Sequence, residues 1–129
     1  MFDPLDGYWD VTVRAPLVTM RRTEKRSDDV TAFARSFGGV YDLLEGDTPE
    51  RMRLLLDIRV SVGRNDPKFE AALVEPRREL FRQFGSTAVL VRTVVGRMQV
   101  ARHIEDDGFA AKVRVFVDEA EGLEWLRSV

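Results

Sequence analysis

Residues 53–60 read RLLLDIRV, and this stretch decides the fold that the sequence predicts. Its centre, Leu54-Leu55-Leu56, is continuously apolar rather than alternating, which is typical of a strand covered on both faces. A second run of this kind, Ala88-Val89-Leu90-Val91, follows later in the chain. Both runs therefore indicate central strands of a sheet that is covered on both faces.

The segment between these two runs predicts a helix over residues 66–84. Asp66 can cap its first turn, and Pro67 suits the first helical position because the N–H it lacks is not needed there. Apolar residues share one face of this helix, and Pro76 is expected to kink or split it: Phe69, Leu73, Leu80, Phe81 and Phe84. A strand, a helix and a second strand in this order require a right-handed crossover and a parallel strand pair.

Towards the amino end, two short strands and a helix are expected. Tyr8–Arg14 alternates, with Trp9 on the face of the valines, and Leu17–Arg22 resumes after a proline. Two strands this close predict an antiparallel hairpin at a sheet edge. Apolar residues then recur at helical spacing over residues 28–45, where Ser27 is the expected N-cap and the pair Gly38-Gly39 a point of bending.

Towards the carboxyl end, the pattern predicts a helix over residues 96–107 with Met98, Ala101 and Ile104 inward, and a last strand over Ala111–Val117. Asp118 should cap a final helix whose apolar residues are Ala120, Leu123 and Leu126, with Trp125 beside them. The whole chain of 129 residues is thus expected to be one α/β domain. It should hold a five-stranded mixed, mostly parallel sheet and four helices.

The composition excludes several classes of function. There is no cysteine and one histidine, so disulfide scaffolds, thiolate metal sites, cysteine nucleophiles and multi-histidine metal sites are excluded. The net charge is −2, and the three thirds of the chain (residues 1–45, 46–86 and 87–129) carry −2, +1 and −1. No nucleic-acid stripe or anionic-membrane patch is expected from this balance. No cofactor is expected either.

The apolar runs and the chain start bear on location. The longest strongly apolar run is far shorter than the ~20 residues that a membrane helix needs, so stable membrane insertion is not expected. The first residues, MFDPLD, lack the basic and apolar regions of a signal peptide. We therefore expect a cytoplasmic protein.

Several segments from residue 50 to 127 resemble small bacterial proteins of the SpoIIAA-like, STAS-related superfamily. The similarity rests on the set of segments rather than on any one of them. The segments are Gly63–Pro67, Phe69–Ala72, Arg78 with Leu80-Phe81, Ala88–Thr93, Gly96–His103, Asp107-Gly108, Val115-Phe116, Asp118–Ala120 and Leu123–Leu126. This resemblance implies a β/α superhelix around a mixed sheet, a single STAS-like domain.

The resemblance also implies a function. The better-known family members are anti-sigma-factor antagonists, which bind a kinase-like partner and are switched by phosphorylation of a serine that opens the helix after a central strand. Here that position reads Asn65-Asp66-Pro67, and Ser61 lies before it, so the serine switch does not carry over. The expectation is a non-catalytic regulatory or interaction domain with a kinase-like or signalling partner. The alternative is a carrier or sensor of an apolar or anionic small ligand, because CRAL-TRIO lipid carriers have a similar layout.

Polar residues gather where two neighbouring strands should end. Parallel α/β sheets bind ligands beyond the carboxyl ends of their strands, and several arginines beside a helix N-terminus can hold a phosphate or carboxylate. The alternative is that Asp66 caps its helix while the arginines pair with Asp57 and other acids. The candidate anion-binding residues are Arg59, Arg64, Asn65, Asp66, Arg92, Thr93 and Arg97.

Other features have plainer explanations. His103 is expected to be an exposed residue near a helix C-terminus, where a partial positive charge is favourable. No nucleophile with a base beside it is recognisable in the sequence, so no enzyme activity is expected. The acids at 105–107 and 118–121 lack the spacing of a calcium loop. The stripe Phe69, Phe81 and Phe84 has the spacing of a core, with an apolar ligand pocket as the alternative.

Self-association is the last expectation. The central strands are apolar on both faces, and an exposed apolar face would need a cover. A kinked second helix or the last helix with Trp125 could supply that cover. Both would require the helices to divide between the two faces, whereas successive right-handed crossovers should place most helices on one side. We therefore expect a homodimer that uses Trp9 or the outer sheet face.

Overall fold

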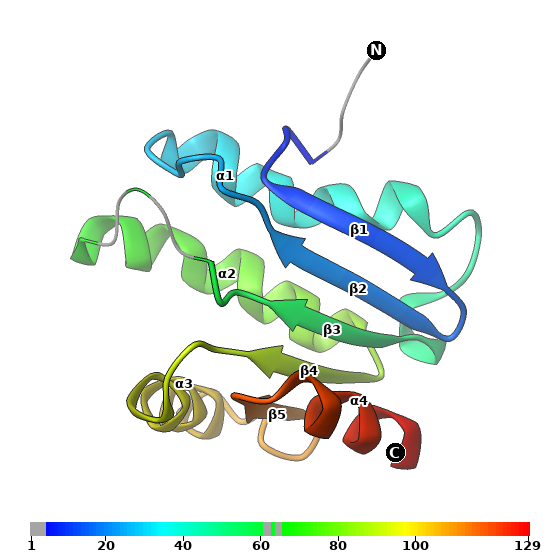
Figure 1. Cartoon of the computed structure of the whole chain (residues 1–129). Helices are drawn as coiled ribbons and strands as arrows, with labels where there is room; N and C mark the ends of the chain where they lie inside the picture. Colours follow the sequence, from blue (N-terminus) through cyan, green and yellow to red (C-terminus); the bar gives the residue numbers. More distant parts are fainter. Residues whose placement is uncertain (1–4, 61–62, 64–65) are drawn as a thin grey trace.

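The computed structural model describes residues 5–60, 63 and 66–129 and confirms the predicted α/β fold (Figure 1). Five strands form one sheet in the order β1-β2-β3-β4-β5, with β1 and β2 antiparallel and the other pairs parallel. The elements are β1 Trp9–Arg14, β2 Leu17–Arg22, α1 Val30–Ser36, η1 Phe37–Leu43, η2 Pro49–Arg51, β3 Arg53–Asp57, α2 Pro67–Gln83, β4 Ser86–Leu90, α3 Val94–Asp106, β5 Val113–Phe116 and α4 Glu119–Ser128.

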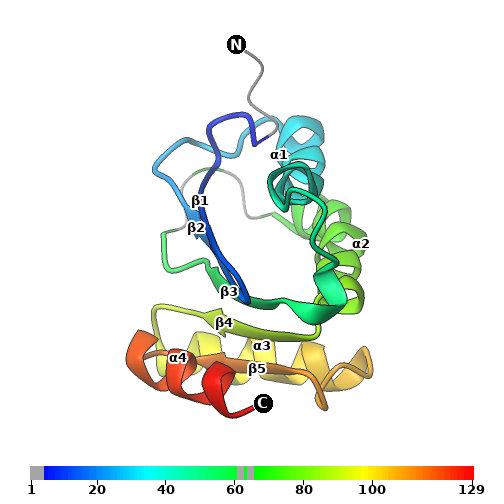
Figure 2. The ribbon, with the colours of Figure 1, turned by 90° about the vertical axis from the view of Figure 1, so that its right-hand side faces the viewer.

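One face of the sheet carries α1, η1, α2 and α3. Leu54 and Leu56 of β3, with Val89 of β4, point towards these helices and belong to the larger core. Figure 2 shows α1 and α2 together on this side of the sheet, where α2 packs against α1 and η1, while α3 packs on β5. The apolar faces of α1 and α2 are thus buried in the larger core, as their spacing predicts.

The other face of the central strands is covered by α4. Leu55, Ala88 and Leu90 point to this side and form a second cluster with Leu126, against which Trp125 packs. The alternation of side chains along β3 and β4 explains why both strands are apolar throughout, because each face meets a helix.

Beyond α4, the second face of β1 and β2 is largely polar. Thr12 and Arg14 are exposed there, and Thr19 is half-buried. The apolar area that motivated the homodimer prediction is therefore covered within the chain. Trp9 is also buried, and its indole N–H donates a hydrogen bond to Ser36 Oγ at 2.9 Å. The homodimer stays a prediction, and it would need residues other than Trp9.

The first helical segment differs from the single helix expected over residues 28–45. It is α-helical over Val30–Ser36 and continues as the 3₁₀ helix η1, which contains Gly38 and Gly39. Two adjacent glycines weaken α-helix propagation, which favours the tighter winding of a short 3₁₀ segment. The N-cap is Asp29, whose carboxylate accepts from the Ala32 N–H at 3.1 Å, rather than Ser27.

The expected split at Pro76 is wrong. Helix α2 runs without interruption over Pro67–Gln83, with Pro76 inside it. Proline removes one backbone hydrogen bond, and burial of Phe69, Leu73, Leu80 and Phe81 on the sheet outweighs that loss.

The expected inner face of α3 is wrong for two residues. Met98 and Ala101 are exposed, whereas Ile104 is buried as expected and Val100 is half-buried. Val100 and Ile104 are four residues apart and so share one helix face. The spacing of Met98 and Ala101 predicted an inward helix face, but both residues lie on the solvent-exposed face of α3.

Candidate functional site

Two consecutive arginines end β2 at the carboxyl edge of the parallel strands. Side chains alternate along a strand, so Arg21 lies on the α4 side of the sheet and Arg22 on the side of α1 and α2. Arg22 shares its face with Val18 and Met20, both fully buried. The two guanidinium groups therefore have different surroundings, which we describe in turn.

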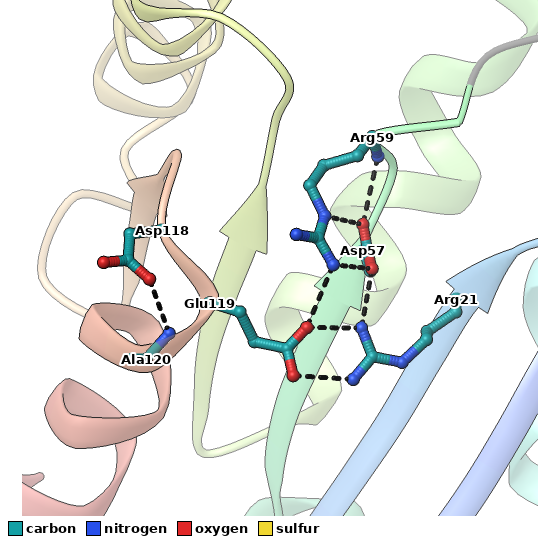
Figure 3. Close-up of polar contacts among 6 residues, drawn as sticks. All are labelled: Arg21, Asp57, Arg59, Asp118, Glu119 and Ala120. Atoms are coloured by element: carbon teal, nitrogen blue, oxygen red, sulfur yellow. Dashed lines mark hydrogen bonds and ion pairs between the residues drawn. The ribbon is translucent and has the colours of Figure 1, made fainter.

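On the α4 side, Arg21 belongs to an ion cluster with Asp57, Arg59 and Glu119 (Figure 3). Its Nη1 donates to Asp57 Oδ2 at 2.7 Å, and Nη1 and Nη2 donate to the two oxygens of Glu119 at 2.6 and 2.8 Å. Arg59 donates from Nε and Nη2 to Asp57 at 2.9 and 2.8 Å, and from Nη2 to Glu119 at 2.9 Å. Two cations and two carboxylates thus neutralise one another.

This pairing shifts the pKa values of both acids. Burial acts to raise the pKa of Asp57, but hydrogen bonds from Arg59 and Arg21 outweigh burial and hold that pKa below its usual value. The hydrogen bond from Arg21 lowers the pKa of Glu119. Each carboxylate is therefore stabilised in its charged form, and the cluster ties β2, β3 and α4 together.

On the opposite side, Arg22 is buried and 7% exposed. Its Nη1 donates to the Tyr8 carbonyl at 2.7 Å, and its Nη2 donates to the Lys25 carbonyl at 3.0 Å. Within residues 5–60, 63 and 66–129, no carboxylate forms an ion pair with it. Two backbone carbonyls supply hydrogen bonds to the cation without supplying a counter-charge.

Aromatic rings surround the Arg22 guanidinium. Its central carbon lies 4.7 Å from the ring centre of Phe33, 5.6 Å from that of Trp9 and 5.9 Å from that of Tyr8. Ring faces attract a cation, yet a cation–π contact stabilises the charge less than an ion pair with a carboxylate does. Burial accordingly lowers the pKa of Arg22, in contrast to Arg21, whose pKa is raised by its hydrogen bond to Glu119.

Arg22 lines a pocket of about 600 Å³ between α2 and α3, which we call the α2–α3 pocket. Its floor is the face of the sheet that α1, α2 and α3 cover, and its lining is mainly apolar. The floor and the Arg22 end are formed by Leu56, Ile58, Val89, Trp9, Phe33 and Phe37, and the helix walls include Phe69, Leu73, Val74, Phe81, Val100 and Ile104. Among the described residues, the pocket thus combines a mainly apolar lining with one buried cation, Arg22.

The outer rim of this pocket is polar. Glu70 and Arg77 of α2 and Gln99 and His103 of α3 line it. His103 is exposed in the last turn of its helix, as predicted. Further along, an ion pair of 2.6 Å between Arg78 of α2 and Asp107 after α3 joins the two walls.

The phenylalanine stripe belongs to the core, as its spacing predicts. Phe69, Phe81 and Phe84 are all buried in the larger core, and Phe84 stacks on Tyr41 with ring centres 6.2 Å apart. Phe69 and Phe81 also line the α2–α3 pocket.

The predicted anion-binding residues serve several roles. Arg59 belongs to the ion cluster. Asp66 and Thr93 cap α2 and α3 by accepting from the N–H groups of Phe69 and Gly96, each at 3.0 Å. Arg92 and Arg97 are exposed. Arg64, Asn65 and also Ser61 lie outside the described residues, so an anion site built from this set stays a prediction.

Metal-binding groups and membrane-spanning helices are both absent from the part of the chain that the structure describes. No group of three or more histidine, aspartate and glutamate side chains lies close enough to hold a metal ion in that part. No helix found there is both long and apolar enough to cross a bilayer. Asp118 and Glu119 are an N-cap and a first-turn acid, as predicted.

Arg22 is the functional candidate that the sequence reasoning missed. The signal was available, because period-two alternation along Leu17–Arg22 places Arg22 on the face of Val18 and Met20. An arginine in phase with two core residues indicates a buried charge. No such argument could show that its carboxylate partner is absent from the described residues.

Comparison with known proteins adds no relative. No family model, curated protein or solved structure matches this chain. The functional argument therefore rests on the site itself.

Proposed function

We propose that this protein binds a small amphipathic anion in the α2–α3 pocket, with the anionic group on Arg22 and the apolar body between the helices. The observation that carries this proposal is the buried Arg22 guanidinium, which has no carboxylate partner among the described residues and lines the pocket. Carrier or sensor of an apolar or anionic ligand was the alternative function expected from the sequence.

The charge argument comes first. A buried ion without a counter-ion is disfavoured by several kcal/mol, and cation–π contacts offset on the order of 2 kcal/mol of this. A ligand carboxylate, sulfate or phosphate beside Arg22 would supply the missing charge. A bidentate pair with a guanidinium would also fix the orientation of the ligand.

The apolar lining argues for the rest of the ligand. Pockets of roughly 300–1,000 Å³ with mainly apolar walls and a few polar groups are typical of small-molecule sites. Leu73, Val74 and Val100 offer no hydrogen-bond partner to a polar chain, whereas an alkyl chain or ring gains free energy by leaving water. An amphiphile with one anionic end matches both parts of the pocket.

Other expected properties remain predictions. Membership of the SpoIIAA-like superfamily, a kinase-like partner, a homodimer and a cytoplasmic location were inferred from the sequence. A ligand-dependent regulatory domain would unite the regulatory role with the pocket, since ligand binding could take the place of the serine switch.

The test uses dodecanoate as the probe and isothermal titration calorimetry as the measurement. Wild-type protein should bind dodecanoate, and Val74→Trp should abolish binding because the indole fills the pocket. Ala72→Trp is the matched control, since Ala72 is exposed on the same helix and does not line the pocket. Circular dichroism of each variant verifies that the fold is kept.

Two results would contradict the proposal. One is wild-type protein that shows no heat of binding and no rise in melting temperature with dodecanoate. The other is Val74→Trp protein that binds dodecanoate as tightly as Ala72→Trp protein does, because binding would then lie elsewhere.

A further inference from the structure

Helix α3 presents an apolar surface to solvent in its first two turns. Val94 is 54% exposed, Val95 is 65% exposed and Met98 is 62% exposed. We call these three residues the α3 patch. Residues three and four apart lie on one helix face, so Met98 stands beside Val94 and Val95. The opposite face of the helix, with Val100 and Ile104, lines the α2–α3 pocket.

Positive charge surrounds the α3 patch. Residues 91–104 contain Arg92, Arg97 and Arg102 and no aspartate or glutamate, so this segment carries +3 with His103 neutral. All three arginines are exposed, and none forms an ion pair within the part of the chain that the structure describes. The first acid beyond them is Glu105, near the end of the helix.

This local charge is hidden in the composition. The whole chain carries −2, and the third that contains α3 carries −1, because its acids lie at 105–107 and 118–124. The even balance between thirds led to the expectation that no anionic-membrane patch exists. Residues 91–104 alone carry +3, so the net charge of the whole third does not reveal this cationic segment.

We propose that the α3 patch docks on the surface of an anionic lipid bilayer. Exposed aliphatic side chains bury themselves at the boundary of headgroups and acyl chains, and arginines beside them are attracted to anionic headgroups. The combination of Val94, Val95 and Met98 with three exposed arginines that form no ion pair with the described residues matches such a surface in both respects. Docking of this kind is peripheral and needs no membrane-spanning helix.

The position of the patch adds a link to the pocket. Because α3 is both the docking helix and a wall of the α2–α3 pocket, docking would bring the rim near Gln99 and His103 to the lipid surface. An amphiphile could then pass between bilayer and pocket. This link rests on the proposed function, whereas the docking itself does not.

The test is flotation of the purified protein with vesicles of phosphatidylcholine alone or of phosphatidylcholine mixed with phosphatidylglycerol. Wild-type protein should float with the mixed vesicles and remain unbound with phosphatidylcholine. Added salt should weaken binding, because the Debye length shortens from about 10 Å at 0.1 M to about 3 Å at 1 M.

Variants locate the surface. Met98→Asp should lower vesicle affinity on the order of tenfold or more, since it removes apolar burial and adds a negative charge. Arg97→Gln should lower it about fivefold, which corresponds to about 1 kcal/mol for one arginine near an anionic surface. The controls Val129→Asp and Arg51→Gln make comparable changes at exposed positions outside α3 and should bind as wild type does.

The results separate this proposal from the ligand proposal. Dodecanoate binding in solution should persist in Met98→Asp, and vesicle binding should persist in Arg22→Met. Failure of wild-type protein to float with either vesicle, equal binding to both, or undiminished binding by folded Met98→Asp and Arg97→Gln would each overturn docking through α3.

Discussion

Arg21 and Arg22 are neighbours in one strand, yet the fold treats them in opposite ways. Arg21 donates to two carboxylates on the α4 side, and the ion cluster around it is neutral. Arg22, on the other side, is more deeply buried and meets two carbonyls and three rings. The first charge is balanced within the protein. The second lacks a counter-ion in the described residues, at the end of a pocket.

The difference separates a structural from a binding arrangement. Carboxylates that already accept from Arg21 and Arg59 leave little for a ligand to add, so the ion cluster is best explained as a clamp between β2, β3 and α4. A buried cation facing a pocket is destabilising until an anion arrives, and such groups are characteristic of binding sites. Three predictions test this contrast.

The largest expected effect is the loss of Asp57. Asp57→Ala leaves Arg21 and Arg59 with Glu119 alone and should lower the free energy of unfolding by about 2–4 kcal/mol. This lies below the roughly 3–5 kcal/mol that breaking a fully buried pair costs, because both arginine side chains are 38% exposed and water can solvate them. Urea denaturation measures the change, and exposed Asp10→Ala should alter the free energy by less than about 0.5 kcal/mol. A loss that small for Asp57→Ala would show that the cluster is no clamp.

The second prediction compares the two arginines directly. Arg21→Met should destabilise the protein by about 1–2 kcal/mol, because it leaves a part-buried carboxylate with fewer partners. Arg22→Met should change stability by less than about 1 kcal/mol and can stabilise, since relief of an unbalanced buried charge offsets two lost hydrogen bonds. Denaturation in the absence of ligand decides between them. Equal destabilisation by both substitutions would mean that Arg22 is as structural as Arg21.

The smallest expected effect is on the acid stability. The folded pKa values of Asp57 and Glu119 lie below their usual values, so their stabilising contribution is complete above the unfolded pKa values of about 4. It declines as pH falls from there through the lowered folded values, because the unfolded chain binds protons first. Asp57→Asn should therefore flatten the fall of melting temperature below about pH 4.5. An unchanged slope would show that Asp57 does not titrate differently in the folded state.

The sequence predicted the sheet well because its signals are local. Continuous apolar runs at Leu54–Leu56 and Ala88–Val91, with Asp66-Pro67 between them, require a buried parallel pair whatever surrounds it. The predicted split at Pro76 and the predicted inward position of Met98 were wrong for the opposite reason. Tertiary burial overrides the weak helix preference of one residue, and a single apolar side chain does not specify which helix face is inward.

The candidate site was harder to predict than the fold. The sequence indicated that polar residues follow the carboxyl ends of two neighbouring strands, and the anion site expected there stays a prediction. Sequence alone could not show that Arg59 would be neutralised by Glu119, which lies sixty residues away in the chain. Nor could it show that Arg22 lies at the end of a pocket, because a pocket is formed by the spacing of α2 and α3 rather than by any motif.

The most direct test of the central claim, that Arg22 awaits an anion supplied by a ligand, is a four-way titration. Calorimetry would compare dodecanoate with uncharged dodecanol, each binding to wild-type protein and to Arg22→Met. We predict that wild type prefers dodecanoate by at least tenfold, as expected for a charge-assisted pair worth about 1.5–3 kcal/mol, and that Arg22→Met loses this preference. Equal preference for dodecanoate in both proteins would contradict the claim.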